Sequence, residues 1–173
     1  AAFSEGMVDD GYDEIVNIDI SKVVIEAMKN KYSSRPQLKY MHMDVRDMSS
    51  FSSGSFTAVI DKGTLDSILC GQSSPENSHK MLTEVMRVLK DDGYYILITY
   101  GSPAQRVSLL KKFPWSIKLH LLGKASSGGN GSGCNTDLTS PISLHDANDG
   151  PPPIPEVSHY GNVHYIYVCI KVS

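Results

Sequence analysis

The chain has 173 residues, a length that suits one domain with a single hydrophobic core. Charged residues make up 20% of it, the formal net charge is -3, and the basic residues form no Lys/Arg run. This composition excludes the electrostatic footprint of a nucleic-acid-binding or membrane-surface protein, so we expect neither partner.

Three apolar runs, each short enough to be a buried strand, stop on an acidic residue. They span residues 15–19, 40–44 and 56–61 and end at Asp19, Asp44 and Asp61. Between the first two, apolar residues at helical spacing predict a helix over 21–32 with Ser21 as its N-cap. Ligands of open α/β sheets bind at the carboxyl ends of the strands, so these acids are candidates for a ligand rim.

The second half of the chain continues the alternation of strands and helices. An amphipathic pattern predicts a helix over 77–90, closed by Asp91-Asp92-Gly93, and then a strand over 94–99. Two more β-rich runs, 115–122 and 163–172, favour an antiparallel pair at the end of the sheet. The pattern predicts an α/β fold with a doubly wound, mostly parallel sheet in one domain, residues 1–173.

Residues 123–156 interrupt this pattern with a Gly- and Ser-rich stretch that ends near Pro151-Pro152-Pro153. Such a composition buries little apolar surface, so we expect a flexible insertion that connects the last two strands. The glycines neither follow a strand nor open a helix, which argues against a phosphate-binding loop.

Four segments carry a family resemblance. They are Asn17-Ile18-Asp19-Ile20-Ser21, Met43-Asp44-Val45-Arg46-Asp47-Met48, Asp61-Lys62-Gly63-Thr64-Leu65-Asp66, and residues 84–93, which contain Arg87-Val88-Leu89-Lys90-Asp91-Asp92-Gly93. Through them the chain resembles the class I S-adenosylmethionine-dependent methyltransferases, which have a Rossmann-like fold. The Asp-Lys-Gly-Thr-Leu-Asp segment is characteristic of the narrower methyltransferase-like 13 group, which includes lysine methyltransferases of elongation factor 1A.

The resemblance implies S-adenosylmethionine as the cofactor and assigns its contacts residue by residue. Asp19 would accept hydrogen bonds from both ribose hydroxyls, and Ile20 would pack beside the adenine. Asp44 would accept from the adenine amino group while the Val45 amide donates to a ring nitrogen. Lys62 would contact the methionine part of the cofactor.

The same resemblance makes Asp61 and Asp66 weaker candidates for the cleft rim and implies no particular catalytic residue. Catalysis would come from aligning an acceptor nitrogen with the methyl group and excluding water. The implied reaction is methylation of a protein lysine or N-terminal amine, with elongation factor 1A as a possible protein substrate. Segments 71–78 and 123–156 would select the acceptor.

One departure from the family is that the chain contains neither the first strand nor the Gly-rich loop, of the form Gly-x-Gly-Asn-Ser, that precedes the matching segment. We therefore expect the domain to be N-terminally incomplete. The strands that end at Asp19 and Asp61 would then lack a neighbour between them.

Plainer roles compete with these assignments. An Asp at a strand end can cap the next helix, Lys62 can be a solvated loop residue, and Arg46 and Asp47 fit a surface pair or turn. For the whole chain, the alternatives are a non-catalytic binding module or inactive fragment with a methyltransferase fold, and a nicotinamide dinucleotide enzyme that uses Asp19 for its ribose.

The remaining features concern metals and location. The histidines form no metal-ligand spacing, so we expect no metal. Cys70, Cys134 and Cys169 form no CxxC pair and favour a reducing compartment. No stretch has the length and apolarity of a bilayer span, and the first residues lack a signal-peptide pattern, so we expect a cytoplasmic protein of unknown oligomeric state.

Overall fold

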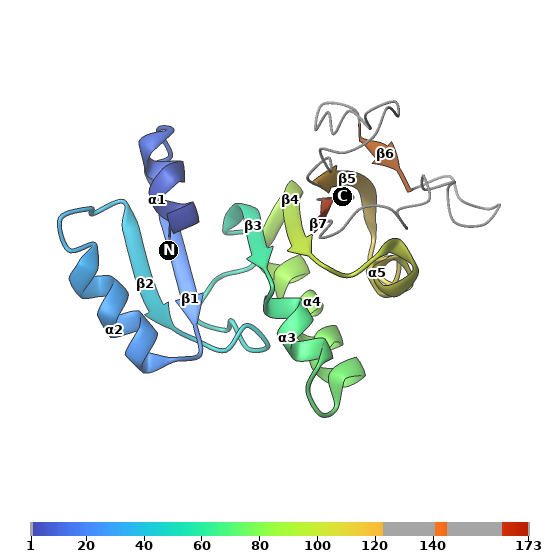
Figure 1. Ribbon diagram of the computed structural model, residues 1–173, viewed down its shortest axis with the longest axis horizontal. Helices are drawn as coiled ribbons and strands as arrows, with labels where there is room; N and C mark the ends of the chain where they lie inside the picture. The colour runs from blue at the N-terminus through green and yellow to red at the C-terminus, as the bar shows by residue number, and fades with distance from the viewer. Residues whose placement is uncertain (1, 123–140, 145–163, 173) are drawn as a thin grey trace, which may run out of the picture. The chain divides into compact units, whose positions relative to one another are not determined.

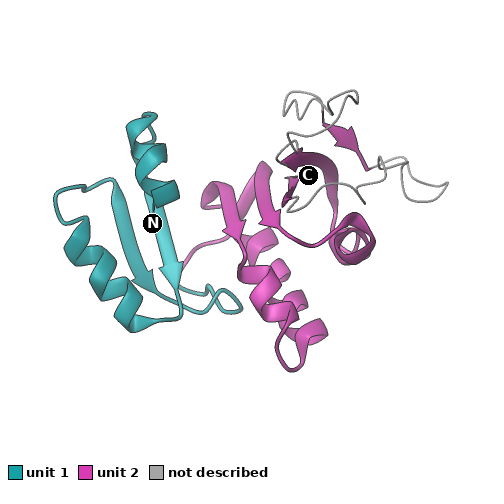
Figure 2. Cartoon of the chain, in the orientation of Figure 1, with its two compact units in different colours: residues 1–50 teal, residues 51–173 magenta. Residues whose placement is uncertain are grey.

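The computed structural model describes residues 2–122, 141–144 and 164–172. Contacts divide the chain into two compact units, Ala1–Ser50 and Phe51–Ser173, coloured teal and magenta in Figure 2. Each unit is a layered α/β arrangement with its own core.

Unit 1 is a small parallel sheet with two helices, whose order is α1 (Ala2–Asp9), β1 (Ile15–Asp19), α2 (Lys22–Lys31) and β2 (Leu38–His42) (Figure 1). β1 and β2 pair in parallel, from Ile15 opposite Leu38 to Asp19 opposite His42. The helix α2 begins where predicted, because the Ser21 hydroxyl accepts a hydrogen bond from the Val24 amide. The buried core is formed by Ile25, Tyr32, Leu38 and Tyr40.

Unit 2 contains a five-stranded mixed sheet with the order β3-β4-β7-β5-β6. Its strands are β3 (Phe56–Lys62), β4 (Leu89–Thr99), β5 (Trp115–Leu122), β6 (Ile142–Ser143) and β7 (His164–Lys171). β3 and β4 are parallel, whereas β7 runs antiparallel to both β4 and β5. The carboxyl ends of β3 and β4 therefore lie at the same edge of the sheet, where Lys62 is opposite Ile98.

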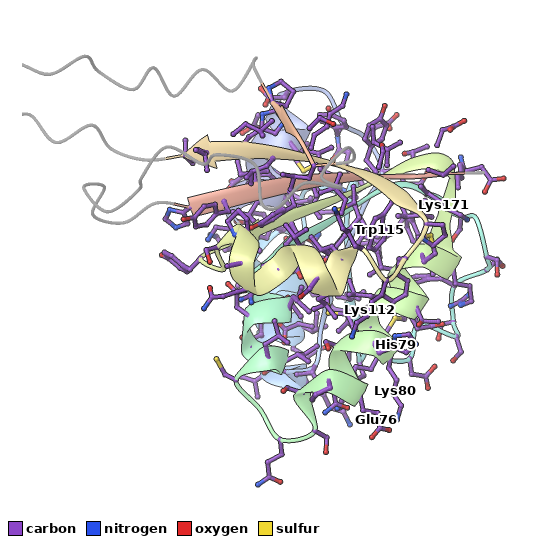
Figure 3. All side chains as sticks on the ribbon, turned by 90° about the vertical axis from the view of Figure 1, so that its right-hand side faces the viewer. Glu76, His79, Lys80, Lys112, Trp115 and Lys171 are labelled. Carbon is purple, nitrogen blue, oxygen red and sulfur yellow. The ribbon has the colours of Figure 1, made fainter. Side chains whose placement is uncertain are left out.

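Three helices complete unit 2: α3 (Thr64–Leu69), α4 (Ser74–Val88) and α5 (Pro103–Leu110). The buried residues of α4 recur at helical spacing and are Ser78, Met81, Leu82, Val85 and Val88. Trp115, labelled in Figure 3, stacks on Tyr95 at a centroid distance of 5.6 Å. Its Nε1 donates to the Leu110 carbonyl at 2.7 Å, which fixes the start of β5 to the end of α5.

The predicted fold class is confirmed, including the antiparallel strands at the C-terminal end. The parallel strands nevertheless fall into two sheets: among the described residues, β1 pairs only with β2 and β3 only with β4. The insertion predicted over 123–156 lies outside the described residues except for 141–144, where Ile142 pairs with Leu119.

Several predicted boundaries were wrong by a few residues. The helix predicted over 77–90 is α4, which starts at Ser74 and ends at Val88, because Leu89 adopts an extended conformation and begins β4. Gly93 lies inside that strand, and a Cβ there would come within 2.7 Å of the Lys90 carbonyl oxygen. The periodicity continued past the true end of the helix because the first residue of β4, Leu89, is also buried.

Candidate functional site

Asp19 ends β1 and has one carboxylate oxygen in use. Its Oδ1 accepts a hydrogen bond from the Ser21 amide at 2.7 Å, and its backbone carbonyl accepts from the Met43 amide at 3.0 Å. The other carboxylate oxygen accepts no hydrogen bond within the described part of the chain. Ile20, the next residue, is 64% exposed although it is a large hydrophobic residue. The end of β1 thus presents a carboxylate acceptor beside an apolar surface.

Asp44 follows β2 and begins a tight turn that ends at Asp47. The Asp47 amide donates to the Asp44 carbonyl at 3.0 Å. Its carboxylate holds Arg46 with both oxygens, the shortest contact being Nη2 to Oδ2 at 2.6 Å. The hydrogen bonds from Arg46 lower the pKa of Asp44 below its ordinary value, in spite of partial burial. The structure has the predicted turn, and the ion pair that it shows for Arg46 is with Asp44.

Val45 lies at the centre of this turn and is half-buried. Its amide has no acceptor among the described residues. A free backbone donor beside a carboxylate is the arrangement that reads a purine edge. In this structure Arg46 occupies the carboxylate half of that arrangement.

Asp61 is 4% exposed, and both of its carboxylate oxygens accept hydrogen bonds. It accepts hydrogen bonds from the Thr64 amide at 2.8 Å, the Leu65 amide at 3.1 Å and the Tyr95 hydroxyl at 3.1 Å. Burial raises its pKa, and these hydrogen bonds offset part of the increase. The structure shows Asp61 as the acceptor for the N-terminus of α3, and its predicted place on a ligand rim stays a prediction.

Lys62 is the last residue of β3, and its side chain is exposed. Gly63 follows with a φ of 83°, a conformation that glycine adopts without strain, and its amide donates to the Ile98 carbonyl at 3.3 Å. This turn ends β3 and starts α3 within two residues. Lys62 is thereby held at the carboxyl edge of the sheet.

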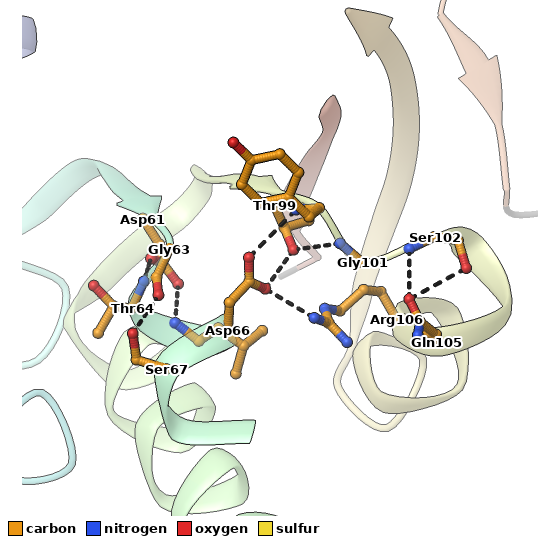
Figure 4. Close-up of polar contacts among 12 residues, drawn as sticks. Asp61, Gly63, Thr64, Asp66, Ser67, Thr99, Gly101, Ser102, Gln105 and Arg106 are labelled. Atoms are coloured by element: carbon orange, nitrogen blue, oxygen red, sulfur yellow. Dashed lines mark hydrogen bonds and ion pairs between the residues drawn. The ribbon is translucent and has the colours of Figure 1, made fainter. Parts of the chain in front are cut away.

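Asp66, on α3, is the centre of the polar network in Figure 4. Its Oδ1 accepts from the Thr99 hydroxyl and from Arg106 Nη2 at 2.8 Å, and its Oδ2 accepts from the Tyr100 amide at 3.3 Å. Burial acts to raise the pKa of Asp66, but the hydrogen bonds from Thr99 and Arg106 outweigh it, so the pKa is lowered. Only 12% of the Arg106 side chain is exposed, and its Nε is buried without a hydrogen-bond acceptor.

The predicted residues fall into two groups, one in each unit. Asp19, Ile20, Asp44 and Val45 belong to unit 1, where the Met43 amide joins the ends of β1 and β2. Asp61, Lys62 and Asp66 belong to unit 2.

Sequence reasoning did not identify Thr99, Tyr100 and Arg106, the partners of Asp66. The Ser102-Pro103 pair could have indicated the start of α5, where Gln105 accepts from the Ser102 amide at 3.1 Å, as Figure 4 shows. No sequence signal relates Arg106 to an aspartate 40 residues earlier.

No helix in the part of the chain that the structure describes is long and apolar enough to cross a membrane. Across residues 2–122, 141–144 and 164–172, no three His, Cys, Asp or Glu side chains are grouped so that they could hold a metal ion.

Comparison with known proteins gives a family match. The family described as "Methyltransferase domain" matches residues 1–97, more than half of the chain. The bovine protein named eEF1A lysine and N-terminal methyltransferase is 38% identical over 123 residues, which are 68% of this chain and 18% of that protein. Bovine EEF1A lysine methyltransferase 4 is 36% identical over 118 residues, 62% of this chain and 46% of that protein. The chain thus spans less than half of the length of either relative.

Solved structures show the same fold at low sequence identity. A SAM-dependent methyltransferase from Methanosarcina mazei has a TM-score of 0.66 at 14% identity, with 98% of this chain and 86% of that chain covered. The N-methyltransferase NodS from Bradyrhizobium japonicum, solved with S-adenosyl-L-homocysteine, has a TM-score of 0.58 at 8% identity, with 92% and 67% covered.

Proposed function

The chain belongs to the methyltransferase domain family, and from this premise we propose that it transfers a methyl group from S-adenosylmethionine to a protein amine. The observation that carries the proposal is the end of β1, where Asp19 keeps one carboxylate oxygen free of hydrogen bonds from the described residues and Ile20 lies exposed beside it. A ribose needs such an acceptor, and an adenine ring needs such an apolar surface.

We assign the cofactor contacts to this chain's own groups. Asp19 accepts from the ribose hydroxyls, Ile20 packs against the adenine, and the Val45 amide donates to a ring nitrogen. Arg46 donates hydrogen bonds to both oxygens of Asp44. Asp44 therefore accepts from the adenine amino group only when at least one of these hydrogen bonds from Arg46 breaks. Lys62, an exposed cation at the carboxyl end of β3, suits the carboxylate of the methionine part.

Methyl transfer depends more on the orientation of the two reactants than on a reactive side chain of the protein. S-Adenosylmethionine supplies an electrophilic methyl group when it is bound. The acceptor nitrogen would contribute its lone pair to the new N–C bond as the bond between the methyl group and sulfur breaks and leaves its electron pair on sulfur. The amine must therefore be unprotonated when it reacts, and one N–H proton of the cationic product is released to solvent. The role of the protein is to hold both reactants in line and to keep water out.

The acceptor we propose is a lysine side chain or an N-terminal amine of a protein, with translation elongation factor 1A as the candidate substrate. The names of the two relatives support this choice. We further propose that residues 1–173 act as one methyltransferase-like domain in the cytoplasm, with the insertion at 123–156 contributing to acceptor choice, and that nucleic acid and membranes are not its partners.

The test is calorimetric titration of S-adenosylmethionine into this chain. Removing the ribose acceptor in Asp19→Ala is expected to raise Kd roughly 10- to 100-fold, since a hydrogen bond to a charged group contributes about 1.5–3 kcal/mol. Asp10→Ala is the matched control, because Asp10 is an exposed carboxylate of the same unit. Equal affinity of the two variants would remove Asp19 from the site, and no saturable binding by the unaltered chain would refute the cofactor proposal.

A second candidate, a non-catalytic binding module, is favoured by one observation. Arg46 occupies both oxygens of Asp44, which closes the carboxylate half of the purine-reading pair. In that case the unaltered chain does not bind S-adenosylmethionine, whereas Arg46→Ala, which frees the Asp44 oxygens from the guanidinium, should gain measurable affinity. If the chain is a methyltransferase, the unaltered chain and Arg46→Ala both show saturable binding.

A further inference from the structure

We propose that Tyr100 is the contact for the acceptor amine, so that the substrate is a lysine whose charged end lies over an aromatic ring; this inference rests on the proposed function. Tyr100 directly follows β4, at the edge of the sheet where β3 ends with Lys62. Ligands of open α/β sheets bind at this edge.

Tyr100 is an aromatic residue that lies outside the hydrophobic core. Tyr100 is 67% exposed, whereas the preceding residue, Thr99, is 1% exposed. The aromatic residues Tyr95 and Tyr167 of the same sheet are fully buried. Tyr100 thus places a large exposed ring at the edge of the sheet where ligands of this fold class bind.

The ring is nevertheless held in place on one side. The His164 ring lies against it, with the centroids 4.3 Å apart and the planes tilted by 41°. This contact spans two strands, because His164 is the first residue of β7. His164 thus contacts the phenol ring, and most of Tyr100 stays exposed.

The backbone on both sides of the ring is also anchored. The Tyr100 amide donates to Asp66, the Gly101 amide donates to the Thr99 hydroxyl at 2.9 Å, and the Gly101 carbonyl accepts from the Tyr167 hydroxyl at 3.0 Å. Asp66 is therefore a positioning residue, which orients Tyr100 through its main chain. Because Arg106 neutralises Asp66, the aromatic ring and not this carboxylate is the group offered to a cation.

An aromatic face suits the acceptor of a methyl transfer better than a carboxylate does. It attracts an ammonium group within about 6 Å of the ring centre, yet it also contacts the uncharged amine that must react and the methylated product. A carboxylate would favour the protonated form, which has no lone pair to donate, more strongly than a ring face does. The long aliphatic stem of lysine can reach such a ring while the peptide backbone stays outside.

The first measurement is binding, which does not depend on turnover. A fluorescent lysine peptide and the same peptide with norleucine, which has no charge, are titrated with the unaltered chain and with Tyr100→Leu. We expect the unaltered chain to prefer the lysine peptide and the variant to lose that preference by roughly 3- to 20-fold, the size of a cation–π contact. Tyr100→Phe keeps the ring face and should retain the preference.

Tyr94→Leu is the matched control, since Tyr94 is a 46% exposed tyrosine near the other end of the paired part of β4. In a methylation assay, Tyr100→Leu should raise KM for the lysine peptide while kcat and the Kd of S-adenosylmethionine stay close to the original values. Loss of the preference in Tyr94→Leu and Tyr100→Leu alike, or no change in Tyr100→Leu, would overturn the assignment.

Failure of the proposed function has a different signature. In that case the unaltered chain transfers no methyl group, while a Tyr100-dependent preference for the lysine peptide would still support Tyr100 as an amine contact. If transfer is intact and the preference does not depend on Tyr100, this inference fails and the proposed function stands.

Discussion

Asp19 in unit 1 and Asp61 in unit 2 end similar apolar strands but have different surroundings. Asp19 is half-buried, engages one oxygen with the Ser21 amide and leaves the other without a partner in the described chain. Asp61 is 4% exposed and accepts three hydrogen bonds from α3 and Tyr95. The comparison teaches that a carboxylate at a strand end is available to a ligand only where the fold does not bury it under the next helix.

The largest expected effect concerns Asp61. Asp61→Ala leaves the Thr64 and Leu65 amides and the Tyr95 hydroxyl without their acceptor, so we expect the free energy of unfolding to fall by about 3 kcal/mol. Urea unfolding followed by circular dichroism measures the change. Asp61→Asn keeps an acceptor oxygen and should recover much of the loss. A loss in Asp61→Ala no greater than that in Asp47→Ala, an exposed turn residue, would contradict a structural role for Asp61.

A second comparison uses the same substitution in each unit. A Cβ on Gly101 would lie 2.2 Å from Arg106 Cζ, so Gly101→Ala displaces the guanidinium from Asp66 and should destabilise the protein by about 2 kcal/mol. A Cβ on Gly6, inside α1, meets nothing within 4 Å, so Gly6→Ala should stabilise it by about 0.5–1 kcal/mol. Thermal and urea unfolding test both signs. Equal effects of the two alanines would mean that a Cβ at Gly101 does not displace Arg106 from Asp66.

The cap of α2 tests the local structure of unit 1. Ser21→Ala removes the acceptor of the Val24 amide and should lower the free energy of unfolding by about 1 kcal/mol. Ser21→Asn restores a capping oxygen and serves as the control. Since Asp19 accepts from the Ser21 backbone, the Kd of S-adenosylmethionine should change little in either variant. A large loss of affinity in Ser21→Asn would show that the hydroxyl itself belongs to the site.

The smallest effect is on the pH dependence of stability, where Asp61 and Asp66 should act in opposite directions. Burial raises the pKa of Asp61 above 3.8, so the folded state retains its proton more tightly and stability falls as the pH rises from 3.8 through the folded pKa. The pKa of Asp66 is lowered, because its hydrogen bonds outweigh burial, so its contribution is complete above 3.8 and is lost as the pH falls through the folded pKa.

Unfolding titrations between about pH 3 and pH 6 separate these two contributions. Asp61→Asn should remove the fall in stability that occurs as the pH increases above 3.8. Asp66→Asn should remove the gain in stability that occurs as the pH increases toward 3.8. Slopes of the same sign for both residues would show that burial does not dominate at Asp61.

The sequence determined the local elements well where a short-range signal exists. The N-cap at Ser21, the strand over 115–122 and the apolar runs that end near Asp19 and Asp61 all lie where the pattern predicts them. Periodicity and capping act within a few residues, so they can be read along the chain. The family, too, was readable from four short segments, and the match to residues 1–97 confirms it.

Only the tertiary structure decided which of the polar and aromatic side chains at the strand ends are available to a ligand. The burial of Asp61 depends on Tyr95, 34 residues away, and the neutralisation of Asp66 depends on Arg106, 40 residues away. The exposure of Tyr100 beside His164 depends on the pairing of β4 with β7. Hydrogen bonding and desolvation depend on residues that are close in space, and the pattern of adjacent residues in the sequence does not predict them.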